Sequence, residues 1–163
     1  MTHPTDLDRL ALQEQRLQFP RFDADTAWAL GSALRTLAEA QGAPITVEVR
    51  LGGKTVFFHA MAGAPPANAD WARRKRNTVE LMHRSSYRVG RELARDGQSL
   101  EAMMGLATRD YCSHGGAVPL RVAGSGVVGV VTVSGLPERE DHALAVQAIA
   151  RLCDVPLEAV ALA

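Results

Sequence analysis

The sequence contains little of what marks a secreted, nucleic-acid-binding or membrane-spanning protein. Its two cysteines, Cys112 and Cys153, are far apart and form no CxxC pair, so reduced thiols in a cytoplasmic protein are the simplest interpretation. Lys plus Arg equals Asp plus Glu, 18 each, so the basic excess typical of nucleic-acid binders is missing. No segment approaches the roughly 18 consecutive apolar residues of a membrane span. We therefore expect a cytoplasmic protein with no nucleic-acid or membrane partner.

The composition is that of one globular domain over residues 1–163, with 47% apolar and 22% charged residues. A chain of this length buries roughly 68–70% of its unfolded surface, so its core needs no disulfide or metal. We expect residues 1–4 to form a loose tail. The opening segment MTHPTDLDRLALQEQ has early acids and no apolar core, and it therefore predicts no signal peptide.

Apolar residues at spacings of three and four predict two helices before any long strand. The first begins at Thr5 or Asp6, which are suitable N-cap residues. The second begins after Asp23 and ends at Gly42. Residues 19–22 (FPRF) are expected to be extended between them.

Two β-hairpins and three further helices account for the rest. Strands are expected at 45–51 and 55–61, and a second β pair at 115–135. The expected helices are a long one from about Asp70 to Arg95, with Asn68 or Asp70 at its start, a short one over 99–107, and a last one from Pro137 to about Cys153. Because hairpins rather than βαβ crossovers build the sheet, the fold class is α+β with a mostly antiparallel sheet.

The run Arg73–Arg76 is the most unusual stretch of charge. Consecutive helical residues point in different directions, so the run does not form one basic patch. Lys75 and Trp71 lie on the stripe expected to face the sheet, whereas Arg73 and Arg76 are expected to turn away from it. Three interpretations stay open. The Lys75 side chain can extend its ammonium group to water, or it can pair with a carboxylate such as Asp141 or Glu140. In the third interpretation, Lys75 and Arg74 together line a pocket that binds an anionic ligand.

Two more stretches place polar residues in unusual positions. His114 precedes Gly115-Gly116 at a strand entrance, which fits either a local turn or a close approach by a ligand. Glu138, Glu140 and Asp141 occupy the first turns of the last helix, where the helix dipole favours acids. His142 faces inward, either as a buried hydrogen-bonded histidine or as a proton-transfer group.

Metal and nucleotide sites are not indicated. The five histidines lack the spacing of a zinc site, and there is no GxSxG or Walker sequence. The segment GSGVVG (124–129) lies inside a predicted hairpin and opens no helix, so it predicts no dinucleotide site. No metal is expected, and the sequence identifies no catalytic residue.

The segments ANADWARRKRNTV and YCSHGGAVPLRVAGSGVVGVVTVSGLPEREDH together resemble the haem-degrading-domain family, the group similar to HbpS and GlcG proteins. The closest resemblance is to its branch with a Trp…Arg-Arg-Lys helix and an SGLP…DH ending. It implies a profilin-like α/β/α sandwich whose four- to five-stranded, mostly antiparallel sheet has helices on both faces. It also implies homo-oligomers, either dimers or larger rings.

The function that the resemblance implies is binding of a small anionic ligand, with haem as a candidate cofactor. The expected ligand-binding residues are Arg74, Lys75, His114, Gly115, Gly116, Ser134, Asp141 and His142. The alternative is a non-catalytic assembly or adaptor subunit, in which Lys75, Asp141 and His142 form a structural network. An enzyme using Lys75 and His142 for proton transfer is a third hypothesis, for which no substrate is indicated.

Overall fold

Helices and strands follow one another nearly as expected, with one short strand added and one helix divided. The structure, a computed structural model, describes residues 5–163, so the tail expected at 1–4 lies outside the described residues. The helices are α1 (Asp6–Arg16), α2 (Ala24–Gln41), α3 (Ala67–Met82), α4 (Ser86–Asp96), α5 (Leu100–Met104) and α6 (Glu138–Leu152). The strands are β1 (Gln18–Phe19), β2 (Thr46–Leu51), β3 (Lys54–Ala60), β4 (Ala117–Val122) and β5 (Gly126–Ser134), and a 3-10 turn, η1 (Leu157–Ala159), follows α6.

The first helix begins, and the second begins and ends, at the residues that the sequence indicates. The side chain of Thr5 accepts a hydrogen bond from the backbone N–H of Asp8, whose carboxylate in turn accepts one from Thr5. Asp23 caps α2 in the same reciprocal way. Gly42 ends α2 in the left-handed conformation that glycine adopts at low cost.

The single long helix expected over 70–95 is wrong. The chain leaves α3 at His83, which has a φ of 55°, and Ser85 caps a new helix, α4. No glycine or proline stands at this break, and apolar residues continue at helical spacing through it. The spacing of apolar residues therefore does not indicate the break. Helix α3 also begins earlier than the expected Asn68 or Asp70.

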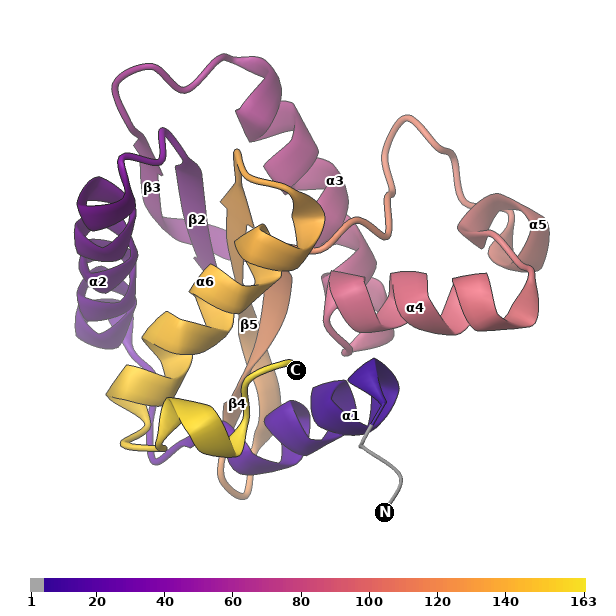
Figure 1. The fold of residues 1–163 in the computed structure, drawn as a ribbon. Coiled ribbons are helices and arrows are strands. Elements are labelled where there is room, and N and C mark those ends of the chain that lie inside the picture. The colour runs from indigo at the N-terminus through magenta and orange to yellow at the C-terminus, as the bar shows by residue number, and fades with distance from the viewer. Residues whose placement is uncertain (1–4) are drawn as a thin grey trace.

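The strands form one five-stranded sheet in the order β1-β4-β5-β2-β3. The pairs β2–β3, β2–β5 and β4–β5 are antiparallel, as the hairpins predicted. The short strand β1, within the stretch expected to be extended, pairs with β4 in parallel, so the sheet is mixed. Figure 1 shows α6 in front of β4 and β5, and α4 with α5 extending away from the sheet.

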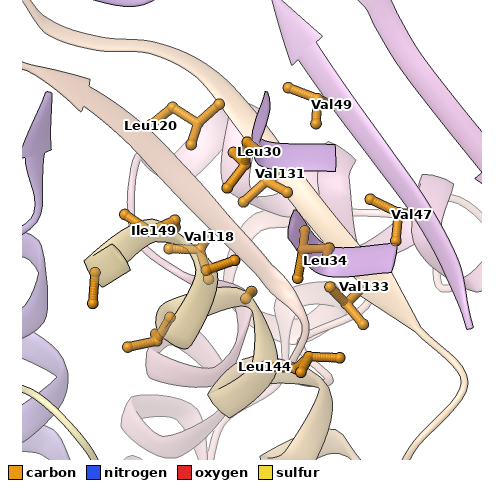
Figure 2. Packing of buried hydrophobic residues seen from close by; sticks show 14 of the residues in the cluster. Leu30, Leu34, Val47, Val49, Val118, Leu120, Val131, Val133, Leu144 and Ile149 are labelled. Atoms are coloured by element: carbon orange, nitrogen blue, oxygen red, sulfur yellow. The ribbon is translucent and has the colours of Figure 1, made fainter. Parts of the chain in front are cut away.

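The two faces of the sheet differ in chemistry. On one face, α2 and α6 pack on a large apolar cluster that includes Val131 and Val133 of β5 (Figure 2). Labelled residues of this cluster are Leu30, Leu34, Val47, Val49, Val118, Leu120, Val131, Val133, Leu144 and Ile149. Burying a side chain of this kind contributes about 1.5–3 kcal/mol. This face therefore supplies most of the driving force for folding.

The opposite face, which α3 covers, is far more polar. The buried apolar contact between α3 and the strands on this face is a small cluster of Val79, Ala117 and Val130. Beside it the strands bury polar side chains, among them Thr46, Glu48, Thr132 and Ser134. The ion pair between Arg76 of α3 and Glu48 of β2 adds to this contact, and the candidate site lies on this side. Among residues 5–163, no helix is both long and apolar enough to cross a bilayer.

Candidate functional site

The four cationic side chains at 73–76 reach separate places, which confirms that they form no single basic patch. Arg73 pairs with Asp70 and Asp110, Arg74 donates to the carbonyl oxygen of Thr108, Lys75 pairs with Asp141, and Arg76 pairs with Glu48. Arg76 was expected to turn away from the sheet. Instead it lies against β2, with 15% of its side chain exposed.

Lys75 is buried and paired. Its residue is 3% exposed, and its Nζ atom lies 2.9 Å from Oδ2 of Asp141 and 3.1 Å from the carbonyl oxygen of Val133. Of the interpretations left open by the sequence, the ion pair with Asp141 is therefore correct, and extension of the ammonium group into bulk water is not. The pair connects α3 to α6 across the end of β5.

The carboxylate of Asp141 is held from three directions. Besides Lys75, the backbone N–H of Leu136 donates to Oδ1 at 2.9 Å and that of Gly135 donates to Oδ2 at 3.3 Å. Burial raises the pKa of Asp141, and the Lys75 ammonium and the two backbone donors oppose that rise. The same loop that ends β5 and starts α6 thus fixes the counter-ion of Lys75.

The ammonium group of Lys75 has one donor to spare. A lysine ammonium carries three N–H donors, and two of them bond to Asp141 and Val133. Within the described part of the chain, no other acceptor bonds to Nζ. Lys75 also lines a cleft of about 290 Å³, so the remaining donor belongs to a group at the surface of that cleft.

The cleft forms where the starts of α3 and α6 meet the end of β5. Its walls are Asn68, Trp71, Lys75, His114, Ser134, Gly135, Leu136, Glu138 and Asp141. The rings of Trp71 and His114 meet edge to face, with centroids 5.0 Å apart. The Glu138 carboxylate accepts a hydrogen bond from the backbone N–H of Gly115 at 3.2 Å. Aromatic, basic and acidic groups therefore surround one small space.

Four of the eight expected site residues line this cleft: Lys75, His114, Ser134 and Asp141. Gly115 and Gly116 do not line the cleft, and they allow close packing of the backbone. A Cβ atom at Gly115 would come within 2.3 Å of the Glu138 carbonyl oxygen. At Gly116, whose φ is 137°, it would come within 2.2 Å of the Val133 carbonyl oxygen. Glycine is thus required there because α6 and β5 approach the backbone closely.

His142, one of the expected ligand-binding residues, does not line the cleft. The ring is fully buried, and its Nε2 lies 2.9 Å from Oε1 of Gln13. The Gln13 amide nitrogen donates to Val160, so its oxygen faces the ring and Nε2 is the donor. Burial, together with the nearby Arg139 cation, lowers the pKa of His142 to about 3. His142 is a neutral structural residue that joins α6 to α1.

Arg74 also lies outside the cleft wall. Its guanidinium carbon sits 4.5 Å from the centroid of the Trp71 ring, a distance typical of cation–π contacts. It therefore supports Trp71 from outside instead of contacting the space that Trp71 encloses.

Five lining residues were missed as site residues by sequence reasoning: Gly135 and Leu136 in the loop after β5, and three side chains at the helix starts. Asn68 was considered as a helix cap, Trp71 as part of the buried stripe, and Glu138 as an acid placed by the helix dipole. All three belong to the first turns of α3 or α6. The signal that could have found them is the meeting of these two helix starts, which depends on tertiary packing and not on spacing along the chain.

Comparison with known proteins places this geometry in a family. The family model described as haem degrading protein HbpS-like matches residues 22–150. The chain is 54% identical over 157 residues to a UPF0303 protein of Azotobacter vinelandii, and the match covers 96% of this chain and 95% of the relative.

Solved structures show the same fold at lower identity. The crystal structure of the Ybr137w protein matches with a TM-score of 0.85 at 24% identity, over 93% of this chain and 90% of that one. A crystal structure of a PduOC:Heme complex matches with a TM-score of 0.65 at 21% identity, over 76% of this chain and 88% of that one. These likenesses confirm the expected sandwich of helices around a mostly antiparallel sheet.

Proposed function

The chain belongs to the HbpS-like haem-degrading protein family, and we propose that its cleft binds a small carboxylate ligand through Lys75. The observation that carries this proposal is the spare N–H donor of a buried ammonium group at the cleft wall. Hydrogen bonds between an ammonium group and a carboxylate are shorter and stronger than neutral ones. This donor faces the cleft, so a carboxylate oxygen placed there can accept it.

The charges around the cleft narrow the class of ligand. Asp141 already balances Lys75, and Glu138 adds a further acid. The start of α6 contributes the positive end of a helix dipole. A carboxylate is therefore best accommodated when the same ligand carries a hydrogen-bond donor for Glu138, as a hydroxy acid does.

The size of the cleft sets a second limit. Small-molecule sites have volumes of about 300–1,000 Å³. The cleft volume of about 290 Å³ is close to the lower end of this range. A ligand of a few carbon atoms fits this space between Trp71 and Lys75. The polar residues then orient the ligand, and the Trp71 ring covers its apolar part.

Haem is implied by the family description and by the likeness to the PduOC complex. His114 supplies an imidazole at the cleft wall, which is the chemistry of an axial ligand. The cleft of one chain is nevertheless too small to enclose a four-pyrrole macrocycle. The residues of a single chain therefore do not fit haem.

The test uses Trp71 as a reporter of the cleft. The chain has two tryptophans, so Trp28→Phe leaves Trp71 as the only one. We would titrate this variant with lactate, propionate and lactamide, which separate the carboxylate from the hydroxyl group. The expected result is a saturable change in emission, strongest for lactate and weakest for lactamide. The proposal is wrong if none of the three gives a saturable change.

A paired variant shows whether Lys75 is responsible. Lys75→Met alone would leave Asp141 buried without its partner, so Lys75→Met combined with Asp141→Leu removes both charges and leaves no unpaired buried charge. This double variant should lose lactate binding. Lys54→Met, which removes the other lysine of the chain at an exposed position, should retain it. Equal binding by all three proteins would overturn the assignment to Lys75.

Assembly into homo-oligomers is a second proposal, and a separate observation supports it. The Lys75–Asp141 pair joins elements of one chain, so it does not favour the alternative in which the same polar residues hold subunits together. A group of exposed aromatic side chains elsewhere on the surface does favour assembly.

A further inference from the structure

An exposed aromatic group lies on α2 and β3, away from the ligand cleft. The chain has only four Phe, two Trp and two Tyr residues, and three of these eight lie at this strand: Trp28 and Phe57 on the α2 side of the sheet, and Phe58, opposite Glu48, on the other side. Trp28 is 68% exposed and Phe58 is 51% exposed, while Phe57 meets Trp28 edge to face at 5.6 Å. Large aromatic side chains are enriched at protein interfaces and rarely cluster on free surfaces. The group therefore marks a contact surface.

The surface includes a groove of about 440 Å³ between α2 and β3. Phe57 and Phe58 of β3 line one side, and Trp28 and Arg35 of α2 line the other. A Cβ atom at Gly31 would come within 2.4 Å of the Phe57 ring, so the glycine lets α2 approach the strand here. The groove is thus a consequence of close helix–strand packing.

The strand along this groove has an open edge. In the order β1-β4-β5-β2-β3, strand β3 is last and pairs only with β2 among the described strands. An edge strand presents unpaired N–H and C=O groups, which a further strand can bond. The aromatic surface and the open edge therefore form one continuous contact site.

We propose that the partner at this site is a second copy of the chain, related by a two-fold axis, with β3 paired antiparallel to β3. This inference specifies the surface used by the homo-oligomer proposed above and rests on it. Two antiparallel copies of one strand satisfy each other's donors and acceptors, as a two-fold interface requires.

Charges beside the groove favour the same partner. Arg35 and Glu39 of α2 both line the groove, lie 3.0 Å apart and are about half exposed. Because they stand one helical turn apart with opposite signs, an antiparallel α2 from a second copy places each Arg35 near a Glu39. Arg35 and Glu39 balance each other's charge, so the groove carries no excess of positive or negative charge that would favour a strongly charged partner of another kind.

The test is the mass of the protein in solution, measured by sedimentation velocity over a range of concentrations. The wild-type chain should sediment as a dimer or a multiple of one, and Phe58→Asp should reduce that mass at least twofold. Leu81→Asp places the same charge at another exposed apolar residue, on α3, and should leave the mass unchanged. A monomeric wild type, or equal effects of the two variants, would overturn the proposal.

A charge exchange tests the orientation of the partner. Arg35→Glu alone should weaken assembly because it places like charges together across the axis, and adding Glu39→Arg should restore it. Failure of the double variant to recover the wild-type mass contradicts the antiparallel arrangement. The Phe58→Asp protein should still bind lactate at the Trp71 cleft, so loss of assembly and loss of ligand binding are separately observable.

Discussion

The Nζ atom of Lys75 lies 2.9 Å from Oδ2 of Asp141, with 4% and 1% of the two side chains exposed. The pair places one charge of each sign in the protein interior, at the end of β5. One of its consequences is structural, because it joins α3 to α6. The other is chemical, because the ammonium group keeps a donor at the wall of a cleft.

Removing one member of this pair should be costly. Lys75→Met leaves a buried carboxylate without its counter-ion and should lower the free energy of unfolding by about 3–5 kcal/mol. Adding Asp141→Leu should recover only part of that loss, because it removes the buried charge but leaves the backbone N–H groups of Gly135 and Leu136 without their acceptor. Urea unfolding measures both values. The exposed control Lys54→Met should change stability by less than about 0.5 kcal/mol. A full-size loss in the double variant would show that the charges themselves are needed.

His142 should make the protein sensitive to acid. Its pKa is lowered from the ordinary histidine value of 6.5 to about 3 in the folded chain, so between these values the unfolded chain binds more protons. Stability is therefore lost as the pH falls below 6.5, by about 2 kcal/mol at pH 5 from this group alone. Unfolding of wild type and His142→Gln at pH 7.5 and pH 5 measures the contribution of His142. Identical pH dependence in the two proteins would refute it.

Gly116 should tolerate no side chain. Its φ of 137° and the Val133 carbonyl oxygen, which would lie 2.2 Å from an added Cβ, combine backbone strain with overlap. Gly116→Ala should cost about 2–5 kcal/mol. Gly124, which has a φ of 80° and open space around its Cβ position, is the matched control. Gly124→Ala should cost only about 1–2 kcal/mol. Equal costs would mean that the contact with β5 is relieved by a small shift.

Haemin should find no dedicated site in the cleft. Because the cleft of one chain is too small to enclose the macrocycle, titration with haemin should give the same Soret spectrum for wild type and His114→Ala. A Soret band that shifts on binding and loses its shift in His114→Ala would instead show that His114 coordinates the iron, for example in a site completed by a second copy.

Much of the fold could be predicted from the sequence because its signals are local. Thr5, Asp23 and Gly42 cap or end helices by bonds within a few residues, and alternation along β2 indicates one apolar face. The break at His83 could not be predicted in the same way. Its left-handed residue is not a glycine, and tertiary packing of α3 and α4 on different elements decides where the helix ends.

The candidate site could likewise be predicted only where its residues follow from local sequence signals. An inward-facing Lys75 follows from helical spacing, and a partner at Asp141 was one of the options that spacing left open. The wall formed by Asn68, Trp71 and Glu138 depends on how two helix starts meet, which no spacing encodes. His142 directly follows Asp141, but the turn of the helix carries its ring to Gln13 on α1.

The most direct test observes the Lys75 ammonium group itself. Lys54 and Lys75 are the only lysines in the chain, so labelling lysine with ¹⁵N at Nζ gives two ammonium sites in a nuclear magnetic resonance spectrum. Burial and pairing should slow hydrogen exchange at Lys75 and make its signal distinct. Saturating lactate should shift the Lys75 signal and leave the Lys54 signal in place. If the Lys75 signal does not move, or both signals move alike, the ammonium group does not bind a carboxylate in the cleft.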